Sequence, residues 1–380
     1  MKWWYAGAPA QYLGFLLLCS CSPSPQSVNT GEITVRIGSV APLTGPQAHL
    51  GKDNENGARL AIEDANKKHL VIGGHKVHFV LISEDDAADP RTGTIVAQKL
   101  VDEQVNGVVG HLNSGTTIPA SKIYYDAGIV QVSPSATNPK YTHQGFTTAF
   151  RVMANDEQQG RVLGEFAAQR LHMHTVAIVD DSTAYGQGLA NEFEKSVVAA
   201  GLKVVVHEHT DDHSTDFSAI LTRIRERVPD LIFYGGMDAQ SGPMMKQVRM
   251  LQIPAIFLTG DGGCSMEFQQ LAGEAAEGAY CSLPGVPLEK MPLGLDFKQR
   301  FNAQYGEIQD YAPYSYDAVG VMIAAMQAAD SIDPEKYRPA LFHLAYPGVT
   351  AHIEFDSNGD LKGGHITLYR WIGGKKLPQD

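Results

Sequence analysis

Residues 107–121 read GVVGHLNSGTTIPAS, a short apolar run bounded by glycines that passes into a stretch rich in hydroxyl side chains. The apolar run is typical of a buried strand, and the segment after it has the composition of a helix start. Ser114, Thr116 and Thr117 then lie where the first helical N–H groups lack intrahelical acceptors. Such N–H groups bind anions without help from lysine or arginine, and this segment has neither. The stretch therefore predicts a site for a small anion such as a carboxylate, with an ordinary serine N-cap as the alternative.

Strand-like and helix-like runs alternate from Thr34 up to this stretch. They are, in order, VRIGSVAP, NGARLAIEDANK, KVHFVLISED, GTIVAQKLVDEQ and GVVGHL. Because the strand-like runs are largely apolar, they predict strands buried on both faces, as in a parallel sheet covered by helices. Right-handed crossovers then place the ligand-binding loops at the carboxyl ends of the strands.

The alternation starts again after Arg151 and predicts a second sheet. Its expected strands are TVAIVDD, KVVVHEH, DLIFYGG and AIFLTGD, with helices near residues 158–170, 186–200, 220–228 and 240–251. The last of these helices contains Met244, Met245 and Met250, which we interpret as core residues because methionine fills irregular gaps.

Two β-rich runs near the C-terminus, HIEFDSNGD and GHITLYRW, predict a hairpin around Asn358 and Gly359. With the preceding elements, they complete two similar halves. The expected fold class is therefore α/β, with two doubly wound parallel-sheet lobes that face each other across a cleft.

Composition excludes several classes of partner. The chain has 380 residues, of which 43% are hydrophobic and 19% are charged, so it can bury a large core and form two domains. Its 30 basic and 42 acidic residues give a formal charge of −12, which repels phosphate backbones. We therefore expect no nucleic acid and no anionic membrane surface as a partner.

The N-terminus is typical of an export leader. Lys2 precedes a mostly apolar stretch that ends in Leu18, Cys19, Ser20 and Cys21, and a polar run follows. This order is similar to a bacterial lipobox, in which the modified cysteine becomes the new N-terminus. We expect lipidation at Cys21, with cleavage of the leader without lipidation as the alternative.

An exported chain folds in an oxidising compartment, where Cys264 and Cys281 become available to each other. We predict that they form a disulfide. Two separate buried thiols are the alternative.

The stretch HEHTDDH contains His207, His209 and His213 with two aspartates. Positions 207 and 209 share one face of a strand, whereas the rest has the composition of a polar loop. We expect a solvated turn here, with a weak zinc or nickel site as the alternative.

The sequence contains no G-x-S-x-G, P-loop, H-E-x-x-H or C-x-x-C motif, which lowers the expectation of an enzyme. Gly186 and Gly188 lack the third glycine of a dinucleotide fingerprint.

Asp261 follows an apolar strand and is a candidate carboxylate at the cleft. Tyr185, just before a helix, is a candidate to pack on a ligand. A solvated loop aspartate and a surface tyrosine are their respective alternatives.

Seven motifs together resemble the leucine/isoleucine/valine-binding proteins of bacterial branched-chain amino-acid ABC importers. They are APLTGPQAHLGKDNENGARLA, EDDAADP, GHLNSGTTIPAS, SPSATNP, DDSTAYGQGLA, FYGGMDAQ and TGDGGC, in this order. The resemblance runs from about Ile33 to the C-terminus. It implies the type I periplasmic-binding fold, in which three crossing segments form the hinge between two lobes, and it implies no catalysis.

The resemblance also implies roles for single residues. Ser114 and Thr137 match positions that bind the ligand carboxylate. Ser135 matches a position whose backbone carbonyl accepts from the ligand ammonium, and Asp261 matches the acidic residue that pairs with it. Tyr185 matches an aromatic residue of the second lobe that closes over the ligand.

The chain departs from one branch of that family at Leu50 and Met237, where the branch has tyrosines near the ligand. A hydrophobic amino acid is still expected in a reshaped pocket. Ala88 and Asn113 occupy the positions of a disulfide found in that branch, which leaves Cys264 and Cys281 as the candidate pair.

We thus expect the extracytoplasmic substrate-binding subunit of an ABC importer, periplasmic and anchored at most by lipid, with no cofactor or metal. Its expected partners are a free hydrophobic amino acid and the permease subunits of the inner membrane, and a monomer is expected. The alternatives are an amino-acid or amide sensor with the same fold, or a hydrolase with Ser114 as nucleophile and His111 as base.

The expected segments are a leader at 1–21, a linker at 22–32, a first lobe at 33–152 plus 283–352 and a second at 153–282 plus 353–380.

Overall fold

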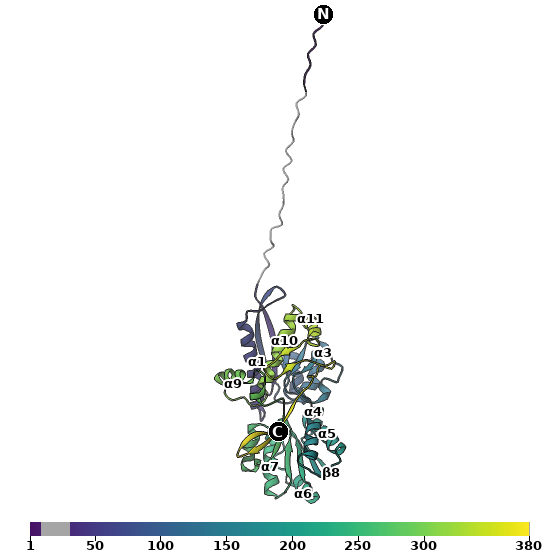
Figure 1. Ribbon diagram of the computed structural model, residues 1–380, viewed down its shortest axis with the longest axis vertical. Coiled ribbons are helices and arrows are strands. Elements are labelled where there is room, and N and C mark those ends of the chain that lie inside the picture. Colours follow the sequence, from purple (N-terminus) through teal and green to yellow (C-terminus); the bar gives the residue numbers. More distant parts are fainter. Residues whose placement is uncertain (9–30, 380) are drawn as a thin grey trace.

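The computed structural model describes residues 1–8 and 31–379 and contains two large sheets, each with its own helices. Figure 1 shows the two halves one above the other along the long axis of the molecule. This arrangement confirms the α/β class and the two doubly wound lobes expected from the sequence. Residues 22–30 of the predicted linker and the lipidation site at Cys21 lie outside the described residues.

The first sheet has the strand order β2-β3-β1-β4-β5-β6. All of its strand pairs are parallel except β2 with β3. The strands are β1 (Ile33–Ala41), β2 (Val71–Ile72), β3 (His75–Asp85), β4 (Gly107–Gly110), β5 (Gln131–Ser133) and β6 (Ala149–Arg151). The helices that connect them are α1 (Ala48–Lys67), α2 (Pro90–Asp102) and α3 (Ser114–Asp126), with the short helix η1 (Pro139–Tyr141) before β6.

The second sheet has the order β15-β14-β11-β10-β9-β7-β8 and is parallel from β11 to β8. Its strands are β7 (Thr175–Asp180), β8 (Lys203–His209), β9 (Leu231–Gly235), β10 (Ile256–Thr259), β11 (Tyr280–Pro284), β14 (Ile366–Ile372) and β15 (Lys375–Gln379). Its helices are α4 (Asp156–Gln169), α5 (Ala184–Ala199), α6 (Ser218–Arg227), α7 (Asp238–Met250) and α8 (Met266–Ala272), with η2 (Asp261–Gly263) and η3 (Gly273–Ala276).

The chain passes between the two sheets three times, after β6, after β11 and before β14. Between the second and third passages it returns to the first lobe, where α10 packs against α1 (Figure 1). The elements of this return are η4 (Leu288–Lys290), α9 (Gly294–Tyr305), α10 (Ala312–Ala328), α11 (Pro334–Leu341), β12 (Tyr346–Pro347) and β13 (His352–Ile353). The buried guanidinium of Arg151 pairs with Asp360 and so ties the first passage to the third. The lobe boundaries given above stay a prediction.

Aromatic and aliphatic side chains fill the two cores. In the second lobe Phe193 of α5 stacks on Phe233 of β9, with ring centroids 4.1 Å apart. Met244 and Met245 are fully buried, as expected, whereas Met250 is 79% exposed. The interpretation of Met250 as a core residue is wrong because it belongs to the exposed last turn of α7. Within the described part of the chain, none of the helices combines the length and apolar composition needed to cross a bilayer.

The hairpin predicted around Asn358 and Gly359 is wrong, because its second strand pairs with other strands than the run HIEFDSNGD. The run ITLYRWI forms β14, which pairs with β15 across the turn at Gly373 and Gly374 and with β11 on its other side. Both turn glycines have positive φ, which two-residue hairpin turns require. Gly359 does turn the chain, but its carbonyl accepts from Arg151 N–H, and only one bridge, Phe355 with Leu361, flanks it.

Candidate functional site

Seven residues named by the sequence lie on segments that follow the carboxyl ends of strands, or at the start of the next helix. In the first lobe they follow β1, β4 and β5, and in the second they follow β7, β9 and β10. All seven are buried, between 0% and 7% exposed. They are Leu50, Ser114, Ser135, Thr137, Tyr185, Met237 and Asp261.

The first-lobe part of the site is the start of α3. Asn113 is the N-cap, and its side chain makes no capping hydrogen bond. The serine N-cap considered from sequence is therefore wrong, because Ser114 is the first residue inside the helix. The hydroxyls of Thr116 and Thr117 donate to backbone carbonyls, whereas the Ser114 hydroxyl accepts from the backbone N–H of residue 138 at 3.2 Å. Helix geometry leaves the N–H groups of residues 114 and 115 without intrahelical acceptors.

The loop after β5 adds Ser135 and Thr137 beside this helix start. The Ser135 hydroxyl donates to Leu112 and accepts from Asn54, so its own hydrogen-bonding capacity is used within the lobe. The fully buried Thr137 hydroxyl has no hydrogen-bond partner among the described residues. A buried hydroxyl in this state is available to a ligand.

Asp156 begins α4 next to Thr137, and its backbone N–H donates to the Thr137 carbonyl at 2.9 Å. Its carboxyl group is fully buried, and neither oxygen makes a hydrogen bond with any described residue. Burial raises the pKa of Asp156; with the neighbouring Thr137 hydroxyl lowering it and the charge of Asp261 raising it, the pKa is about 8. In this arrangement the group is therefore mostly protonated at neutral pH.

The carboxylate of Asp261 accepts hydrogen bonds from three side chains of the site. One carboxylate oxygen accepts from Gln159 at 2.8 Å and from the Tyr185 hydroxyl at 2.9 Å, and the other accepts from the Tyr311 hydroxyl at 2.8 Å. The three donors are neutral side chains. Burial raises the pKa of Asp261, and its hydrogen bonds, first that of Tyr311, lower it in part. The carboxylate is thus oriented but not neutralised, which suits an incoming cation.

Tyr311 reaches Asp261 from the first lobe because Asp53 holds the turn that carries it. The carboxylate of Asp53, on α1, accepts the backbone N–H groups of residues 309–312. The Tyr311–Asp261 hydrogen bond therefore spans the two lobes.

Other side chains also join the lobes directly. His49 at the start of α1 lies 2.8 Å from a carboxylate oxygen of Asp238 at the start of α7. The amide of Asn138 donates to the carbonyl of Ala184 at 2.6 Å. Leu50, Tyr185 and Met237 belong to one buried apolar cluster that extends across both lobes. The structure is therefore a closed arrangement, with apolar and polar groups of both lobes in contact.

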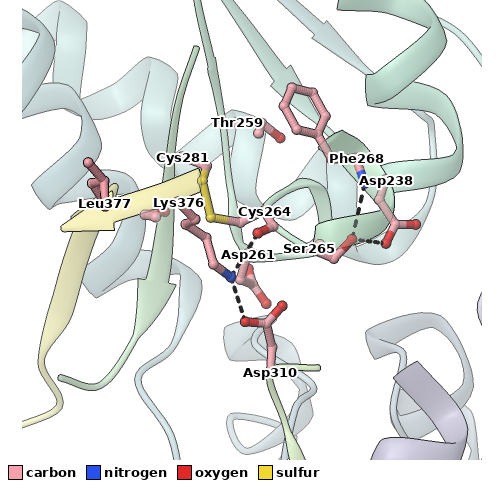
Figure 2. The surroundings of a disulfide bond; sticks show 12 residues. Asp238, Thr259, Asp261, Cys264, Ser265, Phe268, Cys281, Asp310, Lys376 and Leu377 are labelled. Carbon is pink, nitrogen blue, oxygen red and sulfur yellow. Dashed lines mark hydrogen bonds and ion pairs between the residues drawn. A yellow bond between two sulfur atoms is a disulfide. The ribbon is translucent and has the colours of Figure 1, made fainter. Parts of the chain in front are cut away.

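The predicted disulfide is present: Cys264 and Cys281 are bonded, with their Cα atoms 5.4 Å apart. Figure 2 shows that it fastens the end of the Asp261 loop to β11. The same figure shows the Lys376 ammonium between Cys264 and Asp310, donating to the carbonyl of the first and the carboxylate of the second at 2.9 and 2.7 Å. The loop that carries Asp261 is thus tied both to its own sheet and to the segment that carries Tyr311.

His111, the base considered for a hydrolase, is fully buried. Its Nδ1 lies 2.9 Å from Asp86 and its Nε2 lies 3.1 Å from the Tyr124 hydroxyl. Because both ring nitrogens are engaged, His111 does not activate Ser114 in this arrangement.

Sequence reasoning missed Gln159, Tyr311, Asp156 and the His49–Asp238 contact. Gln159 lies inside a helix, and Tyr311 comes 50 positions after the carboxylate that it contacts. No local pattern marks either residue as a ligand of Asp261. Asp156 was detectable only as an acidic residue in the first turn of a helix, which is a common feature.

Comparisons with known proteins identify the family of this chain. Residues 34–375 match the family described as periplasmic binding protein. The Leu/Ile/Val-binding protein homolog 1 of Brucella melitensis is 34% identical over 341 residues, 90% of this chain and 91% of the relative. The leucine-, isoleucine-, valine-, threonine- and alanine-binding protein of Pseudomonas aeruginosa is 34% identical over 339 residues, 89% of this chain and 90% of the relative.

Solved structures show the same fold. A leucine-binding protein LivK from Thermotoga maritima superposes with a TM-score of 0.84 at 26% identity, covering 91% of this chain and 98% of the other. The branched-chain amino-acid transporter substrate-binding protein LivJ from Streptococcus pneumoniae, solved with isoleucine, gives 0.81 at 26% identity, covering 91% and 99%.

Proposed function

This chain belongs to the periplasmic binding protein family, and on that premise we propose that it is the extracytoplasmic substrate-binding subunit of an ABC importer for a branched-chain or other hydrophobic amino acid. The observation that carries the proposal is the Asp261 carboxylate, buried among neutral donors beside apolar side chains. The relatives of this chain that are named for leucine, isoleucine and valine support the same ligand class.

A free amino acid is a zwitterion, and both of its charges need partners when they leave water. We assign the carboxylate to the first lobe, to the N–H groups at the start of α3 with the hydroxyls of Ser114 and Thr137. We assign the ammonium to the second lobe, to Asp261, with the Ser135 carbonyl as a further acceptor. Leu50, Tyr185 and Met237 supply the apolar surface for the side chain of the ligand. The Asp156 carboxyl lies beside Thr137 and is mostly protonated, so it is an additional donor for the ligand carboxylate.

Because the two poles of the ligand are held by different lobes, the ligand stabilises the closed arrangement over an open one. A micromolar site, worth about 8 kcal/mol, is ample to shift that equilibrium. The permease of the inner membrane then recognises the closed protein. Delivery to a permease, a monomeric state and a lipid anchor at Cys21 are parts of this proposal.

Calorimetric titration of the exported protein tests the proposal. The ligands are the twenty amino acids, leucinamide, which lacks the carboxylate, and N-acetylleucine, which lacks the ammonium. We expect an aliphatic amino acid to bind best and both derivatives to bind at least about 30-fold more weakly, since a buried charge that loses its partner costs roughly 2–5 kcal/mol.

The variant Asp261→Asn removes the charge but keeps the shape of the site. We expect it to lose at least about 30-fold in affinity for the best amino acid. Wild-type affinity for the variant, or equal binding of N-acetylleucine and leucine, would overturn the ammonium assignment.

A further inference from the structure

A second cluster of polar side chains lies at the carboxyl ends of β7 and β8 in the second lobe. Asp180 ends β7, and His209, which ends β8, is its register partner, while His207 precedes His209 on the same face of β8. One side-chain oxygen of Asp180 and one ring nitrogen of each histidine all lie within 4.8 Å of one another. None of these residues takes part in the amino-acid site described above.

The donor atoms of this cluster lie close enough together to share one metal ion. The Nε2 atom of His207 and the Nδ1 atom of His209 lie 2.8 and 2.7 Å from the same oxygen of Asp180. Around a tetrahedral Zn²⁺ with bonds of about 2.1 Å, donor atoms are about 3.4 Å apart, so a movement of well under 1 Å by each histidine ring away from Asp180 admits the ion. We propose that Asp180, His207 and His209 bind a divalent transition-metal ion of the Zn²⁺ class.

Neighbouring groups fix the orientation of two of the three ligands. The other ring nitrogen of His207, Nδ1, lies 2.7 Å from a carboxylate oxygen of Glu194 on α5. A metal-bound histidine is commonly held in this way by a carboxylate on its second nitrogen. The other oxygen of Asp180 accepts from the backbone N–H of Ser182 at 2.8 Å. Asp180 and His207 are therefore held in place by the fold of the second lobe.

The donor set selects the class of ion. Two imidazole nitrogens and one carboxylate oxygen suit Zn²⁺, Ni²⁺ or Cu²⁺, whereas Ca²⁺ needs six to eight oxygen ligands. The charges also balance, since Asp180 and Glu194 together offset a divalent ion, and Glu208 between the histidines is already paired with Arg223. The His209 side chain is 56% exposed, so the ion is reached from solvent and a water completes its coordination.

The solvated turn expected after the strand part of HEHTDDH is present at residues 211–213, where the His213 side chain is 90% exposed and its Nε2 lies 3.6 Å from Asp212. His207 and His209 lie on the strand, as expected. His213 therefore provides a matched control four residues from His209.

Calorimetric titration of Zn²⁺ into the exported protein, purified without a histidine tag, tests the site. We expect one Zn²⁺ per chain and no binding of Ca²⁺. His207→Ala and His209→Ala should each weaken Zn²⁺ binding by at least about tenfold, since each removes one of three ligands. His213→Ala should bind as the wild type does. The visible absorption of bound Co²⁺ should report tetrahedral nitrogen and oxygen ligands in the wild type and be lost in His209→Ala.

Absence of stoichiometric Zn²⁺ binding by the wild type would overturn the proposal. An equal loss of affinity in His213→Ala would overturn it as well, because the ion would then be held by the loop. Thermal unfolding of each variant verifies the fold, and His209→Ala, a change at an exposed side chain, remains decisive if His207→Ala unfolds. These outcomes are independent of amino-acid binding.

Discussion

The surroundings of Asp261 fit its proposed role in binding the ammonium group of the ligand. Its carboxylate is only 4% exposed, and its three side-chain donors, Gln159, Tyr185 and Tyr311, fix its direction without cancelling its charge. A buried charge of this kind is costly until a partner arrives, so part of the binding energy of an ammonium ligand repays that cost. Orientation by neutral donors keeps the electrostatic attraction for the ligand.

Removal of the Tyr311 hydroxyl tests this view at the residue scale. Tyr311→Phe deletes the hydrogen bond that crosses from the first lobe to Asp261. A buried acceptor left without its donor costs about 1–3 kcal/mol, so we expect the affinity for the best amino acid to fall by roughly 5- to 150-fold in calorimetry.

Tyr337→Phe is the matched control. This fully buried hydroxyl donates to the carbonyl of Asn106, and both residues lie within the first lobe. Its loss should lower the unfolding temperature and leave the affinity unchanged. If both variants lost the same affinity, the interlobe hydrogen bond of Tyr311 would have no special part in binding.

At the scale of elements, the starts of α1 and α7 meet through His49 and Asp238. Burial of the His49 ring lowers its pKa, but the hydrogen bond and charge of Asp238, with a smaller contribution from Glu267, raise the pKa above the usual value of 6.5 in the closed arrangement. The contribution of this pair to closure is therefore complete below pH 6.5, and it is lost as the pH rises through the raised pKa.

We therefore expect amino-acid affinity to decrease from pH 6 to pH 8.5, by roughly fivefold, since ion pairs that stay partly accessible to water contribute up to about 1 kcal/mol. His49→Gln should remove that part of the pH dependence. Calorimetry of the wild type and the variant at both pH values measures it. The assignment of this pH dependence to His49 would be contradicted if the wild-type affinity rose with pH. It would also be contradicted if the affinities of the wild type and of His49→Gln changed equally with pH.

Also at the scale of elements, the disulfide stabilises the segment from η2 to β11. The bond closes a loop whose ends are 17 positions apart, and such loops contribute about 3 kcal/mol to the free energy of unfolding. Reduction, or the double variant Cys264→Ser with Cys281→Ser, should lower that free energy by about this amount in denaturant unfolding. Since Cys264 follows Asp261 by three residues, affinity should also decrease.

The double variant provides the control, because dithiothreitol should have no effect on it. A wild type whose unfolding did not respond to reduction would show that the loop is held by packing and by Lys376 instead.

For the whole molecule, closure depends on how closely the lobes approach. A Cβ atom on Gly188 of α5 would lie 2.4 Å from the side-chain nitrogen of Asn138 and 3.2 Å from Asp156. Gly188 has helical backbone geometry, so its backbone accepts a larger side chain, but that side chain collides with Asn138 of the first lobe and also crowds Asp156.

Gly188→Leu should therefore keep the fold and lose amino-acid affinity by at least about tenfold, since overpacking costs roughly 1–3 kcal/mol. Small-angle X-ray scattering should show that the best amino acid reduces the radius of gyration of the wild type and not that of the variant. Ala199→Val, at the exposed end of the same helix, should behave as the wild type. Compaction of Gly188→Leu by the ligand would refute this account of closure.

The sequence by itself determined the order and class of most elements. Apolar runs such as TVAIVDD and amphipathic runs such as NGARLAIEDANK have periods that specify strand or helix locally, and their alternation predicts parallel sheets. The motifs also pointed to Ser114 and Asp261, and the export leader pointed to the disulfide between Cys264 and Cys281. These features were accessible because each depends on residues close together in the chain or on a resemblance that covers all of it.

Only the tertiary structure decided which distant groups meet. It brought Gln159 and Tyr311 to Asp261, His49 to Asp238, and Asp180 to the two histidines of β8. It also paired β14 with β15 and β11, where local turn residues predicted another hairpin. The physical reason is that periodicity fixes which face of an element is apolar, whereas side-chain hydrogen bonds depend on which loop ends the packing of whole lobes brings within about 3 Å.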